Sequence, residues 1–124
     1  MRETKWWTWH IAAGVVILIL LTLHMLIMHL DNLIGAFNPS GGEAIAWENV
    51  LARSQLTFFA VAYVVLLGAA LYHGLYGART ILFELSPGPA VQKLVTVIFW
   101  VGGLALFVLG SVAAIAVKVK DFGT

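Results

Sequence analysis

The sequence predicts an all-α integral membrane protein with three transmembrane helices, and two observations support this fold class. Only 10% of the 124 residues are charged and 61% are hydrophobic, whereas soluble domains carry about 25% charged residues. The charges also leave three long gaps, between Lys5 and Asp31, between Arg53 and Arg79, and between Lys93 and Lys118. Since about 20 apolar residues of helix cross the hydrocarbon core of a bilayer, each gap is long enough for one crossing.

The first span is predicted from about residue 6 to residue 30. It begins with Trp6, Trp7 and Trp9, whose indole rings favour the headgroup layer, and it ends near His29. The apolar run is too long for the core of a signal peptide, and no small-residue cleavage site follows it. We therefore expect this segment to be retained as a helix.

Two further spans follow a polar connection. The connection contains Asn-Pro-Ser-Gly-Gly and is predicted to be a loop, with a short amphipathic turn at about 43–50. The second span is predicted at about 54–85 and stops at the segment Ser-Pro-Gly-Pro, 86–89, because proline cannot continue a helix. The third span is predicted at about 90–117, so that residues 1–124 form a single membrane-anchor domain.

Small residues are frequent in the third span, and they allow membrane helices to approach one another closely. They are Gly102, Gly103, Gly110, Ser111, Ala113 and Ala114. We expect them to serve packing within the chain, while three helices leave much surface for neighbouring proteins.

Charge and cysteine content exclude several classes of function. The formal net charge is +1 and no basic stripe is present, which argues against a nucleic-acid partner. The chain has no cysteine, which excludes disulfides, thiolate metal sites and iron–sulfur ligation by its own residues.

The distribution of basic residues predicts a cytoplasmic N-terminus. With that orientation, four basic residues face inward, namely Arg2, Lys5, Arg79 and Lys93, and three face outward, namely Arg53, Lys118 and Lys120. The positive-inside rule favours the orientation that places more basic residues on the cytoplasmic side.

Two histidines, His24 and His73, lie well inside predicted spans. Ionisable residues in a span are costly and usually functional. Neutral imidazole is a common axial ligand of haem iron in helical-bundle cytochromes, so the two histidines are candidate haem ligands. The structural alternative is a histidine that only hydrogen-bonds to a neighbouring helix.

Small and basic residues follow His73. Gly74 is its neighbour, and Gly77 shares its helix face, so a flat macrocycle could lie against this strip. Close helix packing by Gly77 is the alternative. Arg79 stands about 9 Å further along the helix and is a candidate partner for a haem propionate, or else an interfacial anchor.

The two candidate ligands are predicted at different depths. His24 lies near the exit side of the first span, whereas His73 lies beyond the midpoint of the second, toward the side where the chain began. They are therefore not expected to clamp one iron between them. Each would need a second ligand from another chain, which predicts two haems stacked across the membrane.

The chain resembles the membrane-anchor (cytochrome b) subunits of succinate dehydrogenases and fumarate reductases. The resemblance is carried by the length, the three spans and the segment 73–84, His-Gly-Leu-Tyr-Gly-Ala-Arg-Thr-Ile-Leu-Phe-Glu. In that family a His-x-x-x-Gly run carries a haem ligand and an acidic residue follows it, a pattern that His73, Gly77 and Glu84 match. Leu85 stands where single-haem members often carry a quinone-binding tyrosine, which favours the two-haem type.

The resemblance implies a function in electron transfer rather than chemistry on succinate. The chain would pack with a second anchor subunit into a haem-binding bundle that holds two haem b groups and relays electrons from an iron–sulfur subunit to quinone. A flavoprotein subunit would oxidise succinate, and the complex would lie in the inner (cytoplasmic) membrane. Trp9, His10 and His29 are candidates for a quinone site, with an aromatic belt as the alternative role of the tryptophan.

Three other functions remain open at this stage. One is a haem-free structural anchor or assembly subunit, and another is a single-haem form in which only His73 is a ligand. The third is a small transporter or channel component, which the absence of an acidic residue or a broken helix at mid-depth disfavours.

Overall fold

The computed structural model describes residues 2–30 and 42–119 of the chain. These residues form four helices and no strand, with α1 at Arg2–His29, α2 at Trp47–Gln55, α3 at Thr57–Glu84 and α4 at Pro89–Val119. Within the described residues, α1 (from Thr4), α3 and α4 are long and apolar enough to cross a membrane. The predicted all-α class with three membrane-spanning helices is therefore confirmed.

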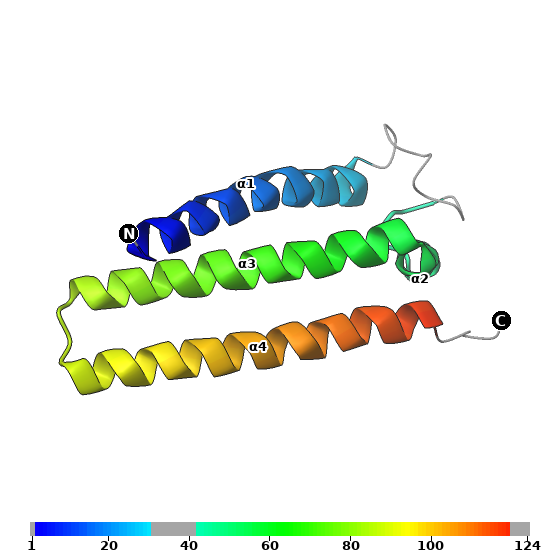
Figure 1. The fold of residues 1–124 in the computed structure, drawn as a ribbon. Helices are drawn as coiled ribbons and strands as arrows, with labels where there is room; N and C mark the ends of the chain where they lie inside the picture. Colours follow the sequence, from blue (N-terminus) through cyan, green and yellow to red (C-terminus); the bar gives the residue numbers. More distant parts are fainter. Residues whose placement is uncertain (1, 31–41, 120–124) are drawn as a thin grey trace.

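The three long helices form a single layer. Figure 1 shows α3 between α1 and α4, with neighbouring helices antiparallel and α2 lying across one end. Extensive packing joins α3 to both of its neighbours. Trp6 on α1 reaches Trp100 on α4, and their rings meet edge to face with centroids 6.3 Å apart. A layer of this kind leaves two broad faces of the central helix uncovered by the chain itself.

The second membrane helix begins later than the sequence suggested. The predicted amphipathic turn at 43–50 overlaps the separate helix α2, which begins at Trp47 and extends to Gln55, and Leu56 adopts an extended conformation between α2 and α3. The predicted loop upstream of α2 falls largely on residues 31–41, outside the described residues.

The stop after α3 follows the predicted proline segment. Helix α3 ends at Glu84, Ser86 takes a left-handed φ of 52°, and α4 begins at Pro89. Proline is favourable at the first position of a helix, because its missing N–H would have no intrahelical partner there. The same residue type therefore ends one membrane helix and starts the next.

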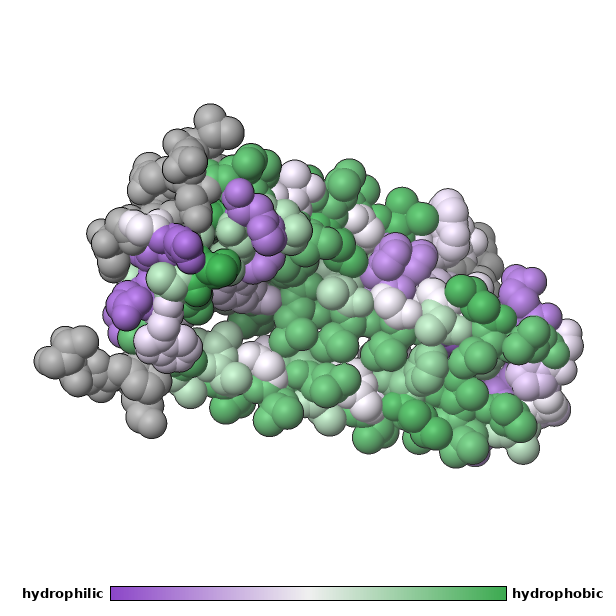
Figure 2. Space-filling view, turned by 180° about the vertical axis from the view of Figure 1, so that it is seen from behind, coloured by the Kyte–Doolittle hydropathy of each residue, from purple (hydrophilic) through white to green (hydrophobic). Residues whose placement is uncertain are grey.

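The surface of the layer is overwhelmingly apolar. Among the described residues, only Ala44, Phe59 and Ala60 are buried hydrophobic side chains, and α4 contains no buried residue at all. Seen from behind, hydrophobic residues cover most of the face, and hydrophilic residues gather mainly toward the two ends (Figure 2). Such a surface suits surroundings of lipid, since water would leave this apolar area unfavourably hydrated.

Two glycines of α4 give the close packing that the sequence predicted. A Cβ at Gly103 would lie 2.7 Å from Leu75 Cδ1, and one at Gly110 would lie 2.5 Å from Leu67 Cδ2. Small residues at these points let α4 approach α3 closely. Gly102 differs, because a Cβ there would meet nothing within 4 Å.

Helix α2 is fastened by two buried polar side chains. Asn49 is fully buried, and its Nδ2 donates to the carbonyl oxygen of Glu43 at 3.0 Å. Arg53 is 1% exposed, donates to the carbonyl oxygen of Ala44, and lies 3.3 Å from the thioether sulfur of Met28 on α1. These contacts join α2, the segment before it and the end of α1.

Replacing Asn49 by alanine is expected to destabilise this end of the molecule. The substitution removes the Nδ2 hydrogen bond to the Glu43 carbonyl, which retains the backbone N–H of Ala46 as a donor, and the loss is about 1 kcal/mol of unfolding free energy. Thermal unfolding in detergent and proteolysis within 43–47 measure the effect, with exposed Gln55→Ala on the same helix as the control. Equal behaviour of the two variants would contradict a fastening role for Asn49.

Candidate functional site

His73 projects from the middle of α3 toward α1. Its Nδ1 lies 3.0 Å from the backbone carbonyl oxygen of His10. Because a carbonyl can only accept a hydrogen bond, this geometry assigns the proton to Nδ1 and leaves the lone pair on Nε2. Metal-ligating histidines typically donate their other ring N–H in this manner, which fixes the orientation of the ring.

The imidazole rings of His10 and His73 also stack on each other. Their centroids are 4.1 Å apart and their planes differ by 6°. Tyr76 adds a third ring, 5.0 Å from His10 and tilted by 40°. The backbone hydrogen bond and the stack together restrict the position of His73.

Two glycines make room for this pair. A Cβ at Gly14 would lie 3.0 Å from Cε1 of His73, and a Cβ at Gly77 would lie 3.3 Å from Cε1 of His10. The two antiparallel helices therefore interlock reciprocally, each histidine lying against the glycine of the other helix. Gly77 was expected to lie beside a haem macrocycle, and in the structure it lies against the His10 ring.

The stacked pair does not have the geometry of two axial ligands on one iron. Axial imidazoles direct their nitrogen lone pairs at the metal from opposite sides, whereas these two rings face each other with their π surfaces. His10 Nδ1 is buried and makes no hydrogen bond within the described residues. Of the two rings, only that of His73 is held in one orientation by a hydrogen bond to a backbone carbonyl.

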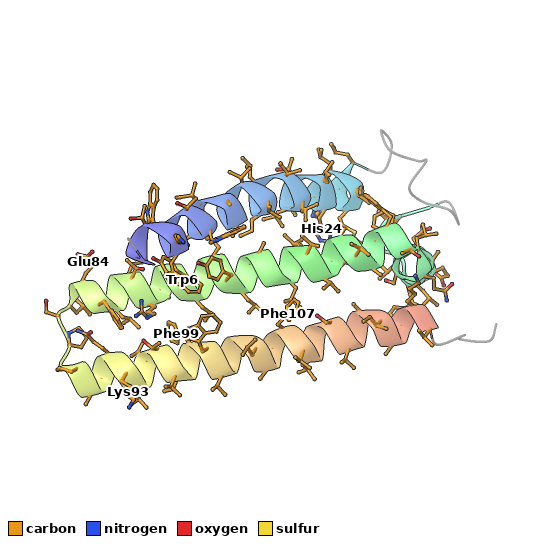
Figure 3. All side chains as sticks on the ribbon, in the orientation of Figure 1. Trp6, His24, Glu84, Lys93, Phe99 and Phe107 are labelled. Atoms are coloured by element: carbon orange, nitrogen blue, oxygen red, sulfur yellow. The ribbon has the colours of Figure 1, made fainter. Side chains whose placement is uncertain are left out.

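His24 lies in a separate environment toward the other end of the layer. Figure 3 labels it on α1, well away from Trp6. Its ring meets Tyr63 edge-on, with centroids 6.0 Å apart, beside a cavity of about 140 Å³ between α1 and α3. Tyr63 precedes His73 by ten residues, or about 15 Å of helix, so the two histidines lie at different levels, as predicted.

The other predicted haem-environment residues do not gather around His73. The Nε of Arg79 donates to Thr96 Oγ1 on α4 at 3.0 Å, and its guanidinium lies 4.1 Å from the centre of the Phe83 ring. Arg79 thus faces α4, whereas His73 faces α1. A Cβ at Gly74 would meet nothing within 4 Å, so this glycine opens onto the surface of the layer.

The three candidate quinone residues are not brought together. Trp9 is 66% exposed, and His10 belongs to the stacked pair. His29 is exposed at the other end of α1, 19 residues from His10 or about 28 Å along the helix. The geometry therefore gives no common site for all three.

Sequence reasoning overlooked Gly14, Tyr63 and Tyr76. One signal for Gly14 was present, because the His-x-x-x-Gly spacing occurs in both helices, at 10–14 and at 73–77. In an antiparallel pair, equal spacing allows the two histidine–glycine contacts to form together.

Within the part of the chain that the structure describes, no cluster of three or more histidine or acidic residues could hold a metal ion. The fold and its histidines define an all-α protein of the membrane-spanning class, with the stacked pair His10 and His73 at one level of the helical layer and His24 at another. No family model, curated protein or solved structure matches this chain.

Proposed function

We propose that this chain is a haem b-binding membrane-anchor subunit of succinate:quinone oxidoreductase. It contributes one axial ligand, His73 or His24, to each of two haems, and a second anchor subunit supplies the other ligand of each. The observation that carries the proposal is the hydrogen bond between His73 Nδ1 and the His10 carbonyl, which leaves Nε2 as the ligand atom.

The residues around the two histidines fit an electron-carrying group. Haem b would supply a carrier of single electrons, and its reduction potential would depend on ligation, hydrogen bonding and exclusion of water. The His10 carbonyl accepts the Nδ1 proton of His73 in a hydrogen bond, the kind of contact that orients a histidine ligand toward a metal. Around His24, side chains such as Leu20, Leu23 and Phe59 provide an apolar lining.

The single-layer architecture supports the proposed assembly. Both broad faces of α3 stay open between α1 and α4, and exposed Gly74 offers one of them a flat strip. A second anchor subunit covering such a face could bring its own histidines to the levels of His24 and His73. The proposed neighbours on the inner side of the cytoplasmic membrane are the iron–sulfur and flavoprotein subunits, and quinone is the electron acceptor.

A haem-free anchor is the second candidate, and one observation favours it. The stack with His10 and the bond to its carbonyl already engage His73 within the chain. In that case the histidines would only fasten α1 to α3. A form with a single haem, held through His73, lies between the two candidates.

The two candidates are separated by purifying the complex through a tag on this chain. The proposal expects co-purifying flavoprotein and iron–sulfur subunits, a reduced-minus-oxidised spectrum of haem b, and two haems per chain by pyridine haemochrome. Co-purification of those subunits without haem would leave the structural anchor. Absence of both haem and those subunits would overturn the assignment to this complex.

A further inference from the structure

A groove runs between α3 and α4, and no histidine lines it. Its cavity volume is about 440 Å³, within the range of about 300–1,000 Å³ that is usual for ligand pockets. Aromatic and aliphatic side chains line it, including Leu71, Leu75, Phe99, Trp100, Leu104 and Phe107. Trp6 of α1 also lines the groove and contacts the Trp100 ring edge to face.

One end of the groove holds an oriented cation. Arg79 lines the groove, and its guanidinium is held by Thr96 Oγ1 and by the face of the Phe83 ring. Within the described residues, the two terminal Nη groups make no hydrogen bond. They remain available as a fork of donors, the geometry with which arginine binds phosphate.

The position of this cation matches the surface of a bilayer. Arg79 stands five residues before the end of α3, or about 7.5 Å of helix. Lys93 is exposed and lies three residues before Thr96, so it shares that strip of α4. Figure 3 shows Lys93, Trp6 and Glu84 at the same end of the layer.

From this end the groove extends into the apolar middle of the layer. Phe107 lies eleven residues beyond Thr96 on α4, which corresponds to about 16 Å of helix. The groove thus combines a cationic mouth at the interface with a long apolar floor. An amphiphile with a negative headgroup is complementary to both parts.

We propose that the groove binds one anionic phospholipid. Its phosphate lies at Arg79, with Lys93 adding to the positive potential, and one acyl chain runs along Phe99 and Phe107. Basic pockets between membrane helices are a recurrent form of anionic-lipid recognition. The lipid proposal does not rest on the haem assignment, because no histidine lines the groove, although the groove shares Tyr76 with the stacked histidine pair.

Native mass spectrometry of the full chain in detergent tests the site. Palmitoyl-oleoyl phosphatidylglycerol and phosphatidylcholine are added in equal amounts, and the wild type is expected to retain one phosphatidylglycerol preferentially. Arg79→Gln should lower that preference about fivefold, the effect of losing about 1 kcal/mol of attraction per basic residue.

Lys118→Gln is the matched control. Lys118 Nζ donates to Thr57 Oγ1, so it too is a cation bound to a threonine of the neighbouring helix, but at the opposite end and outside the groove. The control should keep the wild-type preference. An equal loss in both variants would mean general attraction to basic residues and would overturn the proposed site.

A second variant tests the groove without removing its charge. Leu104→Trp fills the apolar floor and should reduce retention of both lipids. Circular dichroism verifies that each variant remains helical. Retention of phosphatidylglycerol at the wild-type level in either Arg79→Gln or Leu104→Trp, or no lipid preference in the wild type, would overturn the proposal.

Discussion

Replacing His73 by alanine is expected to remove one haem b from the purified complex, and replacing His24 by alanine is expected to remove the other. The expectation follows from the different levels of the two rings, one beside His10 and the other beside Tyr63. A methyl group cannot ligate iron, so each variant should lower the pyridine haemochrome content from two haems to one. The residual spectra should differ, because each variant keeps a different haem.

Two further histidine variants serve as controls. His29→Ala, at the exposed end of α1, should leave both haems in place. His10→Ala removes the stacked ring but keeps the backbone carbonyl that orients His73, so haem should remain bound with a changed reduction potential. Retention of two haems by His73→Ala would contradict the ligand assignment and favour the fastening role of the pair.

The extent of the helices could be predicted from the sequence because it depends on local properties. Gaps between charges mark the spans, and the prolines at 87 and 89 mark the turn between α3 and α4. The separation of α2 from α3 could not be predicted in this way. Asn49 and Arg53 fasten α2 through residues such as Met28 of another helix, and such contacts exist only in the folded chain.

The sequence did not predict which side of each membrane helix contacts its neighbours. Apolar residues surround each membrane helix, so no single stripe shows which side meets a neighbour. The single layer and the stack of His10 on His73 therefore depend on how the antiparallel helices align. The direction of Arg79 was predictable, however, because six residues of helix place it about 120° around the axis from His73.

Replacing Gly14 by valine is expected to lower the free energy of unfolding by about 1–3 kcal/mol, the usual cost of overpacking. A Cβ there would lie 3.0 Å from Cε1 and 3.2 Å from Nδ1 of His73. That ring cannot swing aside without losing its bond to the His10 carbonyl and its stack on the His10 ring. The midpoint of thermal unfolding in detergent measures the effect on the isolated chain.

Gly74→Val is the matched control for this variant, because a Cβ at Gly74 meets nothing within 4 Å. Both variants make the same change in helix propensity, so the difference between them isolates the contact with His73. In the proposed complex, Gly14→Val should also disturb the haem proposed at His73 and leave the haem proposed at His24 unchanged, since His24 lies ten residues further along α1. Equal stability of the two variants would show that α1 and α3 do not depend on this contact. Loss of both haems from Gly14→Val would mean that the two levels of the layer are coupled, and independent ligation by His24 and His73 would have to be abandoned.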